Sequence, residues 1–102
     1  MRPDRALQVI AIAGSLRAAS INAAFCRAAA RLAAEEGRLH IEICGDLGAL
    51  PLFNPDLEGA PPAIVERFRR AIGAADALLI ASPEYAHGIS GVLKNALDWL
   101  VS

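Results

Sequence analysis

The feature that most constrains the fold is the alternation of short apolar runs with longer segments of helical period. Residues 7–13 and 77–81 are almost continuously apolar, which is typical of strands covered on both faces by helices. Residues 39–43 alternate apolar and polar side chains, as a strand near the edge of a sheet does. The order strand, helix, strand, helix, strand, helix predicts an α/β layer with a parallel sheet and right-handed crossovers.

Three helices are expected between and after these strands. The first follows a Ser20 N-cap and stops at Gly37, the second opens at Pro62 and ends at Gly73, and the third begins at Ser90. Their apolar stripes, expected to face the core, are Ile21, Phe25, Ala28 and Leu32 in the first helix, Val65, Phe68 and Ile72 in the second, and Val92, Leu93, Ala96, Leu97 and Leu100 in the third. Residues 45–62 are rich in Pro and Gly and predict an irregular connection.

Length, charge and cysteine usage exclude several classes of protein. A length of 102 residues fits a single domain over 1–102, and a net charge of −1 without basic runs argues against nucleic-acid binding. Since no stretch approaches the roughly 18 apolar residues of a membrane span, no membrane segment is expected. Cys26 and Cys44 form no CxxC pair and are predicted to be buried, reduced thiols in a cytoplasmic protein.

The loop after the first strand, residues 14–20, has the chemistry of an anion site. A strand that runs into a helix N-terminus presents unpaired backbone N–H groups and the positive end of the helix dipole. Ser15, Arg17, Ser20 and Asn22 can add hydroxyl, guanidinium and amide donors, and a terminal phosphate fits this set. The alternative is that Ser20 only caps the helix and Arg17 is a solvated surface residue.

The loop after the third strand, residues 82–89, could hold a flat heteroaromatic ligand. It places Glu84, Tyr85 and His87 between Pro83 and Gly88, with free backbone donors beside an aromatic ring. The alternatives are an ordinary half-buried tyrosine and a surface histidine. The sequence contains no HExxH helix, no histidine-rich metal site and no GxSxG elbow, so no metal ligand and no catalytic side chain is assigned. That lack points to a cofactor that carries the reaction.

Three motifs together resemble a known family. They are Gly14-Ser15-Leu16-Arg17-x-x-Ser20-x-Asn22, Ser82-Pro83-Glu84-Tyr85, and Gly91-Val92-Leu93-Lys94-Asn95-Ala96-Leu97-Asp98-Trp99-Leu100. Their sequence and spacing closely resemble the NADPH-dependent FMN reductase family of flavodoxin-like proteins, over residues 7–102. The resemblance implies a three-layer, flavodoxin-like, doubly wound parallel sheet with FMN as cofactor and NADPH or NADH as hydride donor.

The resemblance also implies which residues bind the cofactor. The FMN phosphate would lie on Ser15, Arg17, Ser20, Ile21 and Asn22, and the isoalloxazine ring would lie along Pro83, Glu84, Tyr85, Ala86, His87 and Gly88. Hydride would pass from NAD(P)H to the flavin and then to a small acceptor such as a quinone or another flavin. Family members usually form homodimers or larger homo-oligomers, and the segment 93–100 with Trp99 would lie near that interface.

The chain departs from the family pattern in two positions and in length. Many relatives have Asn where this chain has Ala86, and many have Pro where it has Ser90, a change expected to affect only the start of the last helix. The family sheet has five strands in the order 2-1-3-4-5, of which only three are predicted here. We therefore expect a truncated member whose third strand is an exposed edge. A non-catalytic module that binds FMN or another phosphorylated ligand, and an inactive fragment of a reductase, are the alternatives.

Overall fold

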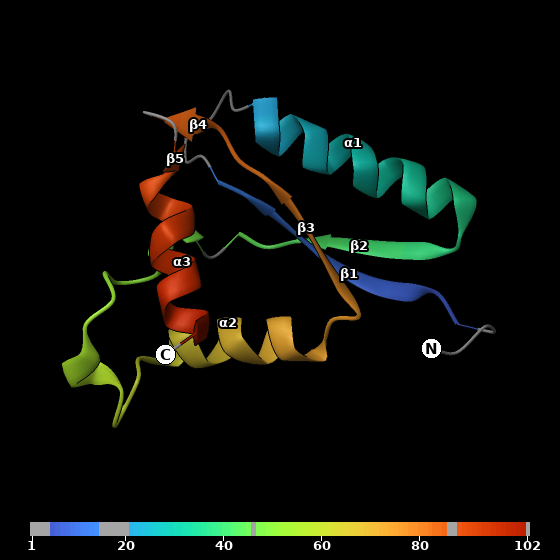
Figure 1. Cartoon of the computed structure of the whole chain (residues 1–102). Helices are drawn as coiled ribbons and strands as arrows, with labels where there is room; N and C mark the ends of the chain where they lie inside the picture. Colours follow the sequence, from blue (N-terminus) through green and yellow to red (C-terminus); the bar gives the residue numbers. More distant parts are fainter. Residues whose placement is uncertain (1–4, 15–20, 46, 86–87, 102) are drawn as a thin grey trace.

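The computed structural model of the chain describes residues 5–14, 21–45, 47–85 and 88–101. Strands β1 (Leu7–Ala13), β2 (Leu39–Ile43) and β3 (Ala77–Ala81) form a parallel sheet in the order β2-β1-β3. The main helices are α1 (Ile21–Glu36), α2 (Ala63–Ala74) and α3 (Gly91–Val101). The predicted strand and helix order is therefore confirmed, and the chain has the three-layer α/β architecture expected of it (Figure 1).

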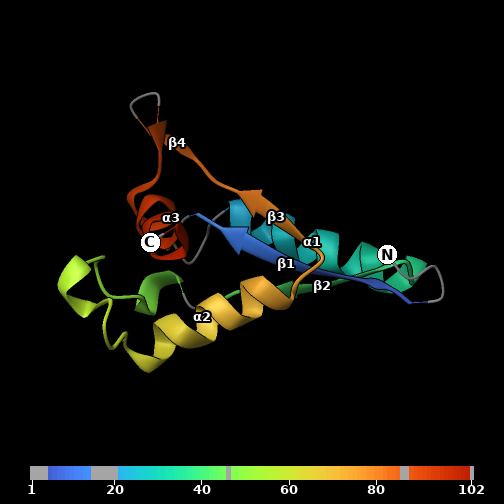
Figure 2. The same cartoon turned by 60° about the horizontal axis from the view of Figure 1, so that its bottom comes forward.

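The helices cover the two faces of the sheet, with α1 on one side and α2 and α3 on the other (Figures 1 and 2). Side chains alternate between faces along the central strand β1. Ile10 and Ile12 join the buried cluster of α2 and α3, which includes Phe68 and Trp99. Val9 and Ala11, also buried, point to the other face, the one that α1 covers.

The exposure of α1 differs from the expected pattern. Its predicted core stripe is largely exposed, with Ile21 at 85%, Phe25 at 57% and Leu32 at 66%, whereas Cys26 and Ala33 are buried. The buried line lies about a third of a turn around the helix from the predicted one. The two buried side chains are small, and the larger apolar side chains are left on the outside.

In α2 and α3, on the opposite face of the sheet, the buried side chains agree more closely with the predicted apolar stripes. Val65 and Phe68 of α2 are buried as predicted, and the helix continues one residue past Gly73. In α3 the buried residues are Leu93, Ala96 and Trp99, with Val92, Leu97 and Leu100 packed against the same cluster. Trp99 needs no partner subunit to cover it, because its side chain is fully buried within this chain, and the interface expected near residues 93–100 stays a prediction.

Two connecting segments that were predicted to be irregular contain short regular elements. The connection of residues 45–62 contains two short 3₁₀ helices, η1 (Leu47–Ala49) and η2 (Pro55–Leu57). The segment 82–89, predicted as a loop, includes a small antiparallel hairpin of β4 (Glu84–Tyr85) and β5 (Gly88–Ile89). This hairpin stands at the end of β3 that leads into α3 (Figure 2).

Both outer strands of the three-stranded sheet show apolar side chains to solvent. On β3, Leu78 is 41% and Ile80 is 44% exposed, in agreement with an unprotected edge. Neither cysteine forms a disulfide; Cys26 is buried as predicted, and Cys44 is only partly buried. Within the described segments, no helix combines the length and the apolar character needed to cross a membrane.

Candidate functional site

The topology places the candidate site at the carboxyl ends of β1 and β3. From β1 the chain crosses through α1 to β2 on one side, and from β2 it crosses through α2 to β3 on the other. Connections that diverge in this way open a crevice beyond the carboxyl ends of the strands, where doubly wound sheets bind ligands. Both loops singled out by the sequence start at this crevice, because Ala13 pairs with Ala81 at the ends of the two strands.

Three residues, Gly14, Ser82 and Ser90, lie in close contact at the ends of β1 and β3, and we call them the junction. The backbone N–H of Gly14 donates to the carbonyl of Ala81 at 2.8 Å, which carries the sheet ladder one residue beyond β1. A Cβ on Gly14 would lie 2.4 Å from Ser82 Oγ and 3.1 Å from Ser90 Oγ. Only glycine fits at this position, because the serine side chains occupy the space that any other side chain would need.

Ser90 connects this junction to α3. Its side chain is only 2% exposed, and its Oγ accepts a hydrogen bond from the backbone N–H of Leu93 at 3.2 Å. This is the bond expected of an N-cap serine, and it satisfies one of the free amides of the first turn. The same Oγ lies 3.5 Å from the Oγ of Ser82, whose hydroxyl can also donate to the carbonyl of Pro83 at 3.3 Å.

The residues predicted to bind the phosphate are described only in part. Ser15, Arg17 and Ser20 lie outside the described residues. Ile21 is the first residue of α1 and is 85% exposed, and Asn22 follows it in the first turn with a half-buried side chain. That turn contains no acidic residue, so nothing in it opposes an anion at the positive end of the helix dipole.

The residues predicted to line the ring surround the small hairpin. Pro83 is half-buried just before β4, Glu84 and Tyr85 form β4, and Gly88 begins β5. Ala86 and His87 lie outside the described residues. The pairing of Glu84 with Ile89 and of Tyr85 with Gly88 makes this segment a two-stranded ribbon attached to the edge of the crevice.

Gly14, Ser82 and Ser90 are not among the binding residues predicted from the sequence, although Gly14 and Ser82 begin the two predicted loops. One signal could have identified Gly14 and Ser82. If two parallel strands that end at residues 13 and 81 are paired, the next residue of each strand, Gly14 and Ser82, comes together. The contact with Ser90 had no such signal, because it depends on how α3 packs. Within the described ranges, no group of three or more His, Cys, Asp or Glu residues could hold a metal ion.

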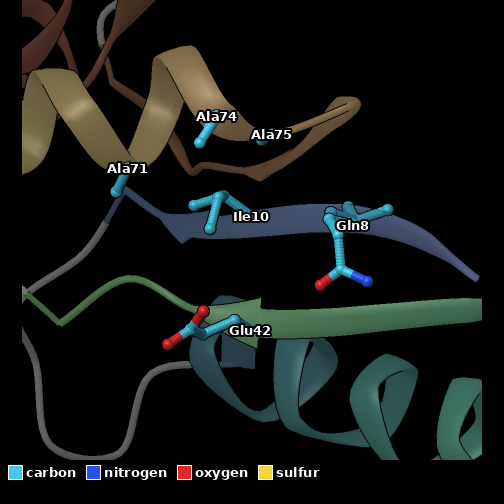
Figure 3. A pocket seen from close by; sticks show the side chains of 7 residues that line it. Gln8, Ile10, Glu42, Ala71, Ala74 and Ala75 are labelled. Atoms are coloured by element: carbon cyan, nitrogen blue, oxygen red, sulfur yellow. The ribbon is translucent and has the colours of Figure 1, made fainter.

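A separate cavity lies at the opposite end of the sheet, between α2 and strands β1 and β2 (Figure 3). Its volume is about 210 Å³, and its polar groups are the amide of Gln8 and the carboxylate of Glu42. The remaining lining residues are Val9, Ile10, Ala71, Ala74 and Ala75. Because Gln8 stands near the start of β1 and Gly14 just past its end, the cavity is distinct from the crevice described above.

The strand order β2-β1-β3, with crossovers through α1 and α2, defines a flavodoxin-like α/β domain whose switch point lies between β1 and β3. The family model for NADPH-dependent FMN reductase matches residues 7–102, so the chain belongs to that family. The resemblance that the three motifs indicated is thereby confirmed.

Individual relatives agree with this assignment. The chain is 50% identical over 98 residues to a probable NADPH:quinone oxidoreductase of Oryza sativa subsp. japonica, covering 93% of this chain and 48% of the relative. It is 48% identical over 95 residues to an NAD(P)H-dependent FMN reductase of Pseudomonas aeruginosa, covering 91% of this chain and 49% of that relative. The solved structure of a flavoenzyme, the NAD(P)H:acceptor oxidoreductase FerB of Paracoccus denitrificans, superposes on this chain with a TM-score of 0.84 at 36% sequence identity. The match covers 94% of this chain and 51% of the FerB chain. The chain thus spans about half the length of these relatives.

Proposed function

We propose that this chain provides the FMN-binding part of an NAD(P)H-dependent flavin or quinone reductase. The observation that carries the proposal is the junction of Gly14, Ser82 and Ser90, which joins the start of the predicted phosphate loop to both ends of the predicted ring-binding hairpin. Family membership over residues 7–102 and relatives named as quinone and FMN reductases support it.

The residues fit FMN in the part of the site that is described. The first turn of α1 carries no acidic residue, and Asn22 can donate an amide N–H near a phosphate. The hairpin can present its backbone groups along the edge of a flat ring. Bound FMN would supply the hydride acceptor, and the chain would contribute binding, orientation and a fixed distance between the phosphate and the ring.

The first test is a titration of FMN into the 102-residue chain, followed by the quenching of flavin fluorescence. Riboflavin, which lacks the phosphate, is the matched control ligand. The proposal expects FMN to bind much more tightly than riboflavin, because the N-terminus of α1 and its loop would hold the phosphate. If neither flavin binds, the chain does not form the site on its own and the proposal fails for this chain.

Arg17→Ala tests the predicted phosphate contact directly. Loss of one charge-assisted hydrogen bond should weaken FMN binding by about 1.5–3 kcal/mol and leave riboflavin binding unchanged. Arg70→Ala, a change at an exposed arginine of α2, is the control for loss of one positive charge. Equal FMN affinity in the wild type and Arg17→Ala would remove this loop from the site.

A second candidate function is a flavin-binding module without turnover. It is favoured by one observation, that β3 lacks a further partner strand within the described residues and exposes Leu78 and Ile80. Steady oxidation of NADPH or NADH with a quinone, measured on the FMN-loaded chain, separates the two functions. Turnover supports the reductase, and tight FMN binding without turnover supports the module.

We further propose that the functional protein is a homo-oligomer, a dimer or larger, in the cytoplasm. Exposed apolar side chains on α1, among them Ile21 and Phe25, support association. The reduced state of Cys26 and Cys44, which form no disulfide, supports a reducing compartment. Light scattering at several concentrations tests the oligomeric state, and fractionation of cells that express the protein tests the cytoplasmic location.

A further inference from the structure

Two hydroxyl groups meet at the base of the β4–β5 hairpin. Ser82 precedes the hairpin and Ser90 follows it, and their Oγ atoms lie 3.5 Å apart. Ser90 Oγ also accepts the backbone N–H of Leu93, while the Ser82 hydroxyl is within reach of the carbonyl of Pro83. One contact therefore links the end of β3, the entry to the hairpin and the first turn of α3.

The hairpin depends on such a contact because its own pairing is short. Only two residue pairs hold its strands together, Glu84 with Ile89 and Tyr85 with Gly88. An isolated two-stranded hairpin is at best marginally stable in water. A contact at its base removes freedom from the whole segment between Ser82 and Ser90, because both ends of the segment are held at the same point.

The same contact also lies directly against Gly14. The positions that a Cβ on Gly14 would need are taken by Ser82 Oγ, Ser82 Cβ and Ser90 Oγ. Since Gly14 is the first residue of the predicted phosphate loop, the serine pair sets the distance between the start of that loop and the base of the hairpin. A ligand that touches only one of the two segments would not depend on this distance, whereas a ligand that spans both would.

We propose that Ser90, acting with Ser82, is a positioning residue for the flavin site, and that its hydroxyl fixes the base of the β4–β5 hairpin relative to Gly14, where the predicted phosphate loop begins. The inference rests on the proposed function, because FMN is the ligand that would span both segments. In the sequence Ser90 looks like an ordinary N-cap. Its contact with Ser82 gives it a role beyond the helix that it caps.

The first arm of the test needs no ligand. Amide hydrogen exchange is measured by NMR on the wild type and on Ser82→Ala, a change that leaves the cap bond itself in place. If Ser82 positions Ser90, exchange of the Leu93 amide accelerates by about fivefold to tenfold. The Lys94 amide, bonded to the Ser90 backbone carbonyl at 2.9 Å, serves as the internal reference. Unchanged exchange at Leu93 would overturn the inference even if the chain binds no flavin.

The second arm measures the FMN dissociation constant in Ser82→Ala, Ser90→Ala and the double variant. Loss of the contact between Ser82 and Ser90 is expected to raise Kd by about tenfold in Ser82→Ala. Ser90→Ala also removes the cap bond to the Leu93 amide, so it should raise Kd at least as much, and the double variant should match Ser90→Ala because Ser82 acts through Ser90. Asn54→Ala removes a cap from η2, away from the junction, and should leave Kd unchanged.

The outcomes of the second arm separate the inference from the function on which it rests. A wild type that binds no FMN contradicts the proposed function, and the exchange arm then decides the role of the serine pair alone. A wild type that binds FMN while both single variants keep its Kd within twofold contradicts the inference. A double variant weakened about tenfold beyond Ser90→Ala would show two independent contacts and would likewise overturn it.

Discussion

The indole N–H of Trp99 donates to the carbonyl of Pro51 at 2.8 Å and joins α3 to the connection that follows β2. Asn95 reinforces this link, since its Nδ2 donates to the same carbonyl at 2.9 Å and its Oδ1 accepts from the backbone N–H of Phe53 at 2.7 Å. Phe53 meets the Trp99 ring edge-on, with centroids 4.9 Å apart. A segment without regular strands is thus held against the core by α3.

Replacing Trp99 with Phe should lower the free energy of unfolding by about 1–3 kcal/mol. The change removes the hydrogen bond to Pro51 and leaves a gap in a fully buried position. It also weakens the stacking of the Arg69 guanidinium, which lies 5.6 Å from the centre of the ring. Urea unfolding provides the measurement. Leu52→Ala, at a side chain that is 82% exposed, is the control and should change stability by less than about 0.5 kcal/mol.

Gly14→Ala should destabilise the chain by about 1–3 kcal/mol through overpacking. The added methyl would lie 2.4 Å from Ser82 Oγ and 2.8 Å from Ser82 Cβ, so either the strand end or the serine must move. Ser82→Gly in the same chain removes both atoms and should restore part of the loss. Gly73→Ala is the matched control. It lies in α2 with nothing within 4 Å of its added Cβ, and thermal unfolding should show a gain of about 0.5–1 kcal/mol.

The β3 edge should make the purified 102-residue chain self-associate as its concentration rises. Leu78 and Ile80 are each more than a third exposed beside the unpaired backbone of an edge strand, an arrangement that favours pairing with another chain. Ile80→Lys should lower the apparent mass measured by light scattering, and Leu52→Lys, away from the sheet, should not. A wild type that stays monomeric at every concentration would contradict this prediction.

The Cys26 thiol should contribute stability that is lost in alkaline solution. Complete burial raises its pKa, and the nearby Arg27 offsets this only in part. A raised pKa in the folded state means that the contribution is fully present below the unfolded thiol value of about 8.5 and disappears as pH rises through the folded value. The stability difference between the wild type and Cys26→Ala should therefore shrink between pH 7 and pH 10. A constant difference across that range would show that the thiol does not titrate in this way.

Labelling provides an independent check on the same burial. A thiol-specific reagent should modify Cys44, which is only partly buried, well before it modifies Cys26. Cys44→Ser should abolish the fast phase.

The sequence determined the order of the main elements and the candidate residues of the site. Local period and turn chemistry are properties of short segments, so the three longer strands, the three helices and the positions of the segments that follow β1 and β3 could be predicted without a structure, whereas the β4–β5 hairpin could not. The edge position of β2 and the apolar character of β3 followed in the same way.

Only the tertiary structure decided which side chains meet. Most of the predicted apolar stripe of α1 faces outward while Cys26 and Ala33 are buried, and Trp99 lies in the core because α3 packs against the connection at Pro51. The contact of Ser90 with Ser82 beside Gly14 depends on the relative placement of three separate elements. Such contacts are set by packing between segments distant in the chain, which no local pattern encodes.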